Sequence, residues 1–305
     1  MLRYIIKRIA IAVPVLIVVV LIIFWMLNVL PGNPISIMMG EKASEAVIQR
    51  VTQEMGLNDP WPLRFARYVL NAAQGDFGRS YKLNRQVTDL IAESFPNTVK
   101  LAVSAALVAW LIGIPAGIVS AIKKNSLVDH AFMGFALFGI SMPVFWAAML
   151  MQWVFGFKLN VLPISGYGTL AHMVMPAIVL GWASSGSIAR MTRSNLLEVM
   201  RNDYIRTARA KGLKESLVVY RHALKNSMMP VVTMMAIQFA GLLSGAVITE
   251  NVFNIGGIGR LTVDAINKRD MPLLQGAVLF STVLIILGNL IADIMYSFLD
   301  PRIRV

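Results

Sequence analysis

The side chains that could perform chemistry are few and scattered along the chain. Cysteine is absent, and the three histidines are His130, His172 and His222. Disulfides, thiol catalysis and a cysteine-ligated metal are therefore excluded, and no spacing suited to zinc or iron is visible. The sequence has no Gly-Lys-Ser/Thr nucleotide loop and no nucleophile beside a base. We expect the chain itself to catalyse nothing, and a membrane-embedded hydrolase is the least favoured interpretation.

The longest charged interruption in the carboxy-terminal half is Asn202–Pro230. Its pattern predicts two short helices joined at Gly212, a residue that suits the left-handed position at the end of a helix. Tyr204, Ala208 and Gly212 recur at i, i+4 and i+8, which predicts a face of small side chains that another protein could approach closely. After Gly212 the pattern predicts an apolar stripe bordered by basic residues, formed by Leu213, Leu217, Tyr220 and Leu224. The segment is therefore predicted to be a docking element.

Several residues inside or beside apolar runs are candidates for a transport path or a gate. Gln238 is the best of them, because an uncharged amide in the middle of a membrane span needs a partner or water. Hydroxyl side chains such as Ser184 and Ser185 serve helix packing more often than a path. The full set of path or gate candidates is Met142, Ser184, Ser185, Gln238, Glu250 and Phe253.

A glycine-rich stretch, residues 251–259, follows Glu250 at the end of the fifth apolar run. A phosphate-binding loop is the alternative interpretation of such a stretch. It lacks the Gly-Lys-Ser/Thr ending and is expected on the outer side of the membrane. We therefore do not expect ATP to bind there.

The elements that must position these residues are membrane-spanning helices. Of the 305 residues, 57% are hydrophobic and only 14% are charged, whereas a soluble domain has about 25% charged residues. Kinks are predicted at 113–117 and 141–143, because proline removes a backbone hydrogen bond and glycine is flexible. Apolar runs long enough to cross a hydrocarbon core lie at 9–30, 99–122, 132–157, 173–189, 229–249 and 273–298.

The distribution of charge predicts the orientation of the chain. Nine basic residues against three acidic ones lie between Arg190 and Lys225, and Lys123 and Lys124 follow the second apolar run. Because positive residues favour the cytoplasmic side, both termini and the 190–230 loop are expected in the cytoplasm. The net charge of +12 then reflects these short loops and not nucleic-acid binding. The first run is expected to be an uncleaved helix, because it is too long for a signal peptide and lacks a small-x-small site.

Residues 31–98 contain no run long enough to span, and their seven basic and seven acidic residues cancel. We expect a translocated loop folded into a small helical cap, with a solvated linker as the alternative. Three cap helices are predicted, at 47–56, 59–75 and 86–96. The predicted domains are residues 1–30 with the first span, the cap at 31–98 and a five-helix core at 99–305.

The residue order of the docking element resembles a known family. Ala-Arg-Ala-Lys-Gly-Leu at 208–213, followed by His-Ala-Leu-Lys-Asn at 222–226 and then Pro230, is similar to the coupling loop of permease subunits of ABC importers. The resemblance is to the branch that handles peptides and nickel. Arg206-Thr207-Ala208 stands where the general EAA motif has Glu-Ala-Ala, and the glycine four positions later is in place. His222, Leu224 and Lys225 stand where the general ending has an aliphatic residue, Leu and Pro, so only the leucine is kept.

The resemblance runs from residue 1 to the end of the chain. Gly-Asp-Phe-Gly-Arg-Ser at 75–80 is similar to the same position in the peptide-permease family. The family pattern Glu-x-x-Phe-x-x-Pro-Gly-Ile-Gly is matched by Glu250, Phe253, Gly257 and Gly259, with Gly256 in place of the proline.

The resemblance implies an all-α, polytopic membrane protein. The implied architecture is the type I ABC importer permease fold, with six transmembrane helices and a small helical periplasmic insertion, in the bacterial inner membrane. This chain and a second homologous permease subunit would enclose a path, and a periplasmic binding protein would deliver the substrate. Two cytoplasmic ATPase subunits, carrying ATP and Mg, would grip the coupling loops, while this chain has no cofactor of its own. The implied coupling loop, 190–228, includes Tyr204, Arg206, Thr207, Ala208, Ala210, Lys211, Gly212, Leu213 and His222.

The cargo is left open by the sequence. Short peptides are the commonest cargo of this branch, and glutathione, nickel chelates and opines travel by close relatives. A self-sufficient secondary transporter is the alternative of a different class, and it would need paired charges in mid-span or an inverted repeat of broken helices. Neither is found in the sequence.

Overall fold

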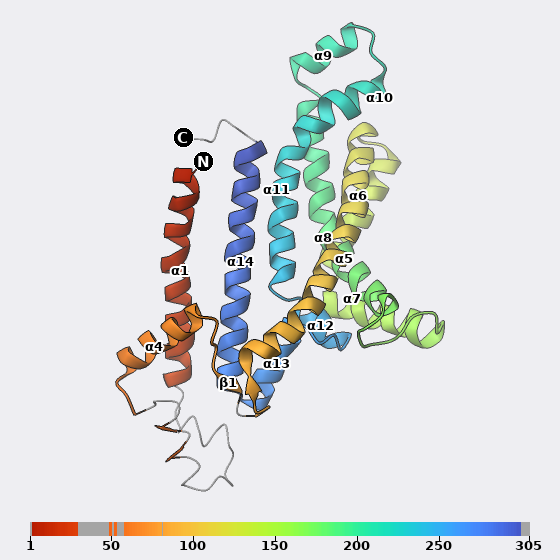
Figure 1. Ribbon diagram of the computed structural model, residues 1–305. Helices are drawn as coiled ribbons and strands as arrows, with labels where there is room; N and C mark the ends of the chain where they lie inside the picture. The colour runs from red at the N-terminus through yellow and green to blue at the C-terminus, as the bar shows by residue number, and fades with distance from the viewer. Residues whose placement is uncertain (1, 30–48, 51, 54–57, 81, 300–305) are drawn as a thin grey trace.

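The computed structural model describes residues 2–29, 49–50, 52–53, 58–80 and 82–299, apart from some side chains near the two ends. Nearly all of this part of the chain is helical (Figure 1). The amino-terminal half contains α1 (Leu2–Val29), α4 (Trp61–Ala73), β1 (Arg79–Ser80), β2 (Arg85–Gln86), α5 (Val87–Ile122), α6 (Leu127–Ser141), α7 (Val144–Met151) and the π-helix η1 (Gln152–Lys158). The carboxy-terminal half contains α8 (Leu170–Val199), α9 (Asp203–Ala210), α10 (Glu215–Leu217), the π-helix η2 (Val218–Ala223), α11 (Leu224–Leu243), α12 (Val247–Val252), α13 (Ile258–Lys268) and α14 (Met271–Leu299).

Several of these helices are long and apolar enough to cross a membrane. Among the described residues, three helical stretches meet both conditions: Val87–Ile122, Glu215–Leu243 and Met271–Ile291. The pair Leu127–Ser141 and Val144–Lys158 forms a fourth if it is one broken span, and Ala10–Trp25 is a shorter apolar helix. These helices support an all-α membrane protein, while the number of six spans stays a prediction.

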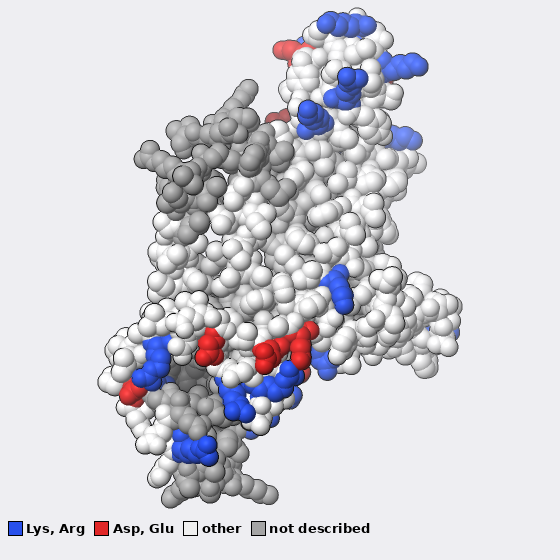
Figure 2. Space-filling view, in the orientation of Figure 1, with Lys and Arg blue, Asp and Glu red and all other residues white. Residues whose placement is uncertain are grey.

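The two ends of the bundle differ in what they carry. The start of α1 and the end of α14 lie at the same end as α9 and α10 (Figure 1). We call this end the elbow end, after the projecting segment 203–223 that it carries. The opposite end, which carries α4, β1, α12 and α13, we call the outer end, after the side of the membrane on which the charge distribution predicts it. Charged side chains gather at both ends and leave a nearly uncharged belt between them (Figure 2). This distribution is typical of a protein that crosses a bilayer.

Helix α5 corrects two expectations. The predicted cap helix at 86–96 and the predicted span at 99–122 are one continuous helix, which passes through Pro96 and Pro115. Proline is tolerated in such helices because neighbouring groups re-satisfy the freed backbone atoms. The predicted disturbance at 113–117 therefore does not interrupt the helix.

The glycines of α5 serve close packing against α8. A Cβ atom on Gly113 would lie 2.8 Å from the carbonyl oxygen of Ser185, and one on Gly117 would lie 2.6 Å from that of Ala189. Gly181 and Gly186 of α8 are similarly crowded by α5 and α6. Small residues at these positions therefore let the helices approach each other closely.

Other predicted boundaries were tested by the structure. The kink at 141–143 is confirmed, since α6 and the helix that follows Pro143 are bent by 102°. The cap helix predicted at 59–75 is α4, whereas most of the one predicted at 47–56 lies outside the described residues. The fourth run extends to Val199, beyond the predicted end at 189. The fifth ends at Leu243 instead of 249, because the chain turns at Gly245 with a φ of +111°.

Candidate coupling surface and transport path

The segment from Asp203 to Ala223, which we call the elbow, projects from the end of the bundle (Figure 1). Helix α9 ends at Ala210, and Gly212 follows with a φ of +75°. This is the left-handed conformation predicted for that glycine, and it turns the chain into α10. Apart from Gly212 and its two chain neighbours, no heavy atom of the described residues lies within 4 Å of the position that a Cβ on Gly212 would take. The turn therefore stands in open space.

Two side-chain contacts hold the elbow in shape. Across the Gly212 turn, the Arg209 guanidinium donates to both carboxylate oxygens of Glu215, at 3.0 and 2.6 Å. The Asn226 amide donates to the Tyr204 hydroxyl at 2.9 Å, which links α9 to the start of α11. All four side chains are exposed. The elbow is thus braced at its surface, where each such contact contributes little free energy.

The predicted small face of α9 is only partly exposed, because one of its three residues is buried. Ala208 is buried inside this chain, together with Ile205, in a cluster that also contains Leu196 and Val218. The spacing of small residues does not show which side of a helix faces its own chain. Here the side with Ala208 faces the chain's own apolar cluster and is buried there. Residues that do face solvent are Tyr204, Arg206, Thr207, Ala210, Lys211 and Gly212.

The predicted apolar stripe after Gly212 is only partly correct. Leu213 and Leu224 pack against the same cluster as Ala208, but Leu217 and Tyr220 are exposed. The buried side chains are instead Val218, Val219 and Ala223, with His222 half-buried. Because η2 is a π-helix with more residues per turn than an α-helix, the inward face shifts relative to an α-helical pattern.

An ion pair near the elbow was missed by the sequence reasoning. Arg193 of α8 donates to both oxygens of Asp129 at 2.8 and 2.7 Å, and Asp129 is buried at the start of α6. Asp129 also accepts the backbone N–H of Asn125 at 2.9 Å. The two partners are 64 residues apart in sequence, so no local spacing pointed to the pair. It ties α6 to α8 just before the chain enters the elbow.

Two of the predicted path residues lie together in the bundle. The Gln238 amide nitrogen on α11 faces the backbone carbonyl of Ser184 on α8 at 3.5 Å, and its amide oxygen has no partner among the described residues. Ser185 is buried and donates to the Trp182 carbonyl, as expected for a packing residue. Met142 is half-buried at the break between α6 and α7, against the cluster around Met173 and Phe253.

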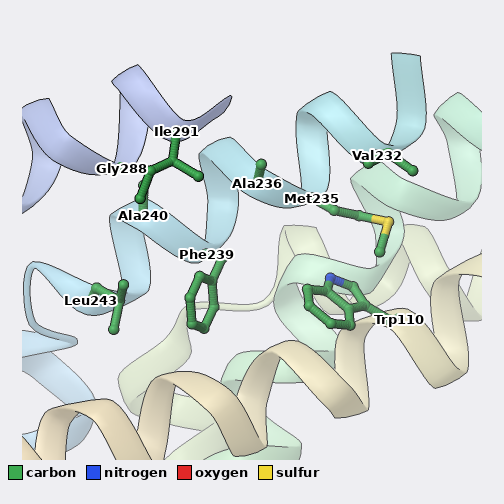
Figure 3. Close-up of a pocket in the computed structure, with 9 residues that line it drawn as sticks. All are labelled: Trp110, Val232, Met235, Ala236, Phe239, Ala240, Leu243, Gly288 and Ile291. Carbon is green, nitrogen blue, oxygen red and sulfur yellow. The ribbon is translucent and has the colours of Figure 1, made fainter. Parts of the chain in front are cut away.

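A cavity of about 320 Å³ lies beside α11. The side chains of Trp110, Met235 and Phe239 turn toward a common space between α5 and α11 (Figure 3). Gly288 and Ile291 of α14 also line it. All of its lining residues are apolar, so the cavity offers nothing that would recognise a polar cargo.

Glu250 is the centre of a buried network at the outer end. Its carboxylate accepts the Thr98 hydroxyl at 2.9 Å and the backbone N–H of Arg260 at 3.0 Å. Thr98 in turn accepts the backbone N–H of Ile258 at 2.8 Å. Burial raises the pKa of Glu250, although these donors act in the opposite direction. We call Glu250, Thr98, Gly257 and Gly259 the outer anchor.

The two glycines of the outer anchor leave room for the carboxylate. A Cβ on Gly257 would lie 2.5 Å from the Glu250 carboxyl carbon, and one on Gly259 would lie 3.0 Å from a carboxyl oxygen. The Asn97 amide adds a hydrogen bond to the Gly256 carbonyl at 3.0 Å. Glu250 and Phe253 are both fully buried, so neither side chain lines a path in this structure. Their arrangement instead fixes the α12–α13 loop to α5.

The chain is similar to known proteins along nearly its whole length. Residues 113–305 match the family described as binding-protein-dependent transport system inner membrane component, and residues 1–102 match its N-terminal counterpart. The chain belongs to this family of permeases. The permease is 42% identical to the glutathione transport system permease protein GsiC of Pectobacterium atrosepticum, over all of this chain and 99% of that protein. It is 39% identical to the dipeptide transport system permease protein DppB of Alkalihalophilus pseudofirmus, over the full length of both.

Solved structures support the fold of the permease. A chain of the MetNI methionine ABC transporter in an inward-facing conformation aligns with a TM-score of 0.60 at 16% identity, covering 69% of the permease and 96% of that chain. A chain from an amino acid ABC transporter with histidines aligns with a TM-score of 0.53 at 12% identity, covering 71% and 95%. At these identities the likeness concerns the fold alone.

Family membership confirms the central expectation from the sequence. The permease is an integral inner-membrane protein and the non-catalytic transmembrane subunit of a binding-protein-dependent ABC importer of the dipeptide and oligopeptide branch. ATPase and binding-protein partners follow from the same membership. The roles of individual residues in the elbow and the outer anchor are not fixed by it.

Proposed function

We propose that the permease forms half of the translocation path for short peptides and couples that path to ATP hydrolysis through its elbow. In this proposal, a second homologous permease subunit completes the path and two ATPase subunits bind the two elbows. A periplasmic binding protein delivers the peptide to the outer end. Both termini and the elbow are cytoplasmic.

The observation that carries the proposal is the shape and charge of the elbow. It projects beyond the bundle, and on the face shown several basic side chains and fewer acidic ones lie at its tip (Figure 2). Arg206 on α9 and Lys211 just after it are exposed, and the turn at Gly212 is exposed between Lys211 and Lys214. Such a surface suits a partner with an acidic or polar groove.

The buried half of the elbow explains how a push on it reaches the bundle. Ile205 and Ala208 of α9 belong to the same buried apolar cluster as Ile118 and Ala121, at the elbow end of α5. A rigid-body displacement of the elbow therefore changes the packing of a spanning helix. Ala208 acts here by transmitting the contact inward, while the exposed residues make the contact with the ATPase.

The outer anchor takes the role of a gate support in this proposal. Glu250 holds the α12–α13 loop to Thr98 on α5, the same helix whose other end shares an apolar cluster with the elbow. Gln238 and Ser184 lie between the two ends and supply the polar groups that a peptide backbone would meet. Met142 and Ser185 contribute to the packing that shapes this region.

The cargo assignment rests on the relatives. The similar proteins include a dipeptide permease and a glutathione permease, and both cargoes are short peptides in the chemical sense. We therefore propose short peptides, glutathione included, ahead of nickel chelates and opines. In cells with the intact importer, uptake of a labelled dipeptide or of glutathione should be competed by unlabelled short peptides. Competition only by a metal chelate or an opine would overturn this choice.

Replacement of Gly212 by leucine tests the coupling role. We expect loss of uptake and of ATPase co-purification, because a leucine side chain would fill the open space at the turn and strain its left-handed backbone. Gly75→Leu is the matched control, since Gly75 has a φ of +83° and is equally open but lies at the outer end. It carries the same backbone strain and should still co-purify with the ATPases. Normal ATPase binding by Gly212→Leu, or equal loss in both variants, would refute the docking role.

A further inference from the structure

A second segment leaves the bundle, at the end opposite the elbow. Residues 144–169, which we call the outer arm, contain α7, η1 and the loop before α8. The helical part of the arm is bent by 102° from α6, and the arm projects sideways on the side opposite α1 (Figure 1). Spanning helices are tilted from the membrane normal by about 20° on average. A helix bent this far from α6 therefore runs nearer to the membrane plane than to its normal.

One side of the outer arm is an exposed stripe of large apolar side chains. It recurs every four residues from α7 into η1 and consists of Phe145, Met149, Trp153 and Phe157. A spacing of four keeps the side chains near one side in both kinds of helix. Each of the four is at least 48% exposed. Exposed apolar surface of this kind marks an interaction site, and no described residue of this chain covers it.

The opposite side of the outer arm is fixed to the rest of the outer end. Ala148 is buried in the cluster that also contains Phe253. The Gln152 amide donates to the backbone carbonyl oxygen of Val252 at 3.0 Å, and the Gly166 N–H donates to that of Phe253 at 2.7 Å. These contacts hold the arm against the α12–α13 loop. The stripe is therefore kept facing away from its own chain.

The side chains of the arm are typical of the boundary between hydrocarbon and headgroups. Lys158 is the only Asp, Glu, Lys or Arg between residues 131 and 189. Its amine lies 4.2 Å from the centroid of the Trp153 ring, at the end of the stripe. Trp146 and Tyr167 are exposed on the same arm. Tryptophan and tyrosine are enriched at this boundary, where lysine extends its amine from apolar surface toward the phosphates.

The loop of the arm fixes its depth. Residues 159–169 are irregular, and Leu159, Val161 and Ile164 are exposed apolar side chains within them. Irregular backbone that faces lipid does not occur inside the hydrocarbon region, because its N–H and C=O groups would lack partners there. Exposed apolar side chains so close together are equally unsuited to bulk water. The headgroup boundary satisfies both, since water reaches the backbone and acyl chains reach the side chains.

We propose that the outer arm lies in the membrane interface at the outer end, with the stripe against the acyl chains and Lys158 among the lipid phosphates. The exposed apolar surface continues from the arm onto α6 through Phe138 and Ile140. The arm thus extends the surface with which a spanning helix meets lipid.

A second permease subunit is the other candidate for covering the stripe. Lysine is depleted at protein interfaces, whereas it is usual at the membrane boundary. Lys158 at the end of the stripe therefore favours lipid. The proposal concerns only the position of the arm in the membrane, so it depends neither on the coupling role of the elbow nor on the cargo.

The test measures the depth of a spin label on the outer arm. The chain has no cysteine, so Phe157→Cys or Val161→Cys gives this subunit a single labelling site. The full importer complex, with any cysteines of the other subunits replaced, is reconstituted in vesicles of phosphatidylethanolamine and phosphatidylglycerol. Power saturation then compares relaxation of the label by oxygen, which concentrates in the bilayer, with relaxation by a water-soluble nickel chelate. We expect oxygen to act more strongly than the chelate at both positions.

Asn267→Cys is the matched control, because Asn267 is exposed near the end of α13 at the same end of the molecule. Its label should respond more strongly to the chelate. Val161 lies in the loop outside α7 and η1, so its label gives a reading that does not depend on the packing of those helices. A label at Phe157 as open to the chelate as the one at Asn267 would place the arm in water and overturn the proposal. A label closed to both reagents would show that a second protein chain covers the stripe, which also overturns it.

The position of the cation is tested separately. With the label at Phe157, Lys158→Glu should raise the response to the chelate, because the lipid phosphates repel the new carboxylate. Lys158→Arg is the matched control, and it should leave the response unchanged because the positive charge remains. Equal responses in the two variants would overturn the placement of Lys158 among the phosphates.

Discussion

The elbow and the outer anchor fasten the chain in opposite ways. The elbow is braced by Arg209–Glu215 and Tyr204–Asn226, whose side chains are exposed. The outer anchor places a carboxylate out of contact with water and satisfies it with Thr98 and backbone N–H groups. A surface brace is cheap to open, whereas a buried polar network is costly to disturb. We therefore expect the elbow to change conformation at low cost in free energy, and the outer anchor to keep its conformation.

The largest expected effect comes from crowding the outer anchor. In Gly257→Ala the new Cβ would overlap the Glu250 carboxyl group, so we expect a loss of about 1–3 kcal/mol in the free energy of unfolding. The φ of Gly257 is −103°, so backbone strain adds nothing. Gly241→Ala on α11 is the control, because no atom lies within 4 Å of its Cβ position. Thermal unfolding of the purified complex measures both. Equal stability of the two variants would mean that the Glu250 carboxyl group does not require a glycine at position 257.

A smaller effect is expected from neutralising the carboxylates themselves. Glu250→Gln turns an amide N–H₂ toward backbone N–H donors and should cost about 1–3 kcal/mol, toward the lower part of that range. Glu215→Gln makes the same chemical change in the exposed Arg209 pair and should cost less than about 1 kcal/mol. Denaturant unfolding of the two variants compares the two ends directly. A larger loss for Glu215→Gln would reverse the contrast between them.

The smallest effect is expected from Tyr204→Phe. It removes the hydroxyl that accepts from Asn226, and global stability should change by less than about 0.5 kcal/mol. Local opening of the elbow should become easier, so amide hydrogen exchange should speed up in 203–226 and stay unchanged in 250–259. Tyr220→Phe, on the exposed side of η2, is the control. Faster exchange at both ends would show that the two regions are not independently fastened.

Much of the fold was predictable because the membrane imposes it. The apolar runs predicted the long apolar helices, Gly212 predicted the turn after α9, and Pro143 predicted the break between α6 and α7. The errors arose where tertiary packing overrides a local pattern. Pro96 does not end a helix whose sides are packed, and Ala208 faces inward because a cluster of its own chain receives it.

The contacts that define the candidate sites were less predictable. Glu250 and the glycines after it were singled out by family resemblance, but the reason for their spacing appears only when Thr98, 152 residues away, comes into contact. The contacts of Asp129 with Arg193 and of Gln238 with Ser184 likewise join residues far apart in the sequence, and no local pattern indicated them. Sequence periodicity reports which side of a helix is buried, and it carries no information on which distant helix lies opposite.

The length of α5 has a mechanical consequence. Thr98 belongs to the outer anchor and Ile118 to the apolar cluster that includes elbow residues, and both lie on the same uninterrupted helix. Twenty residues separate them, so they stand about 30 Å apart along the axis. For a stiff rod of that length, a tilt of about 10° about one end carries the other through about 5 Å, the pitch of one helical turn. In the coupling proposed above, one piece of backbone therefore joins the two ends, and no relay of side chains is needed between them.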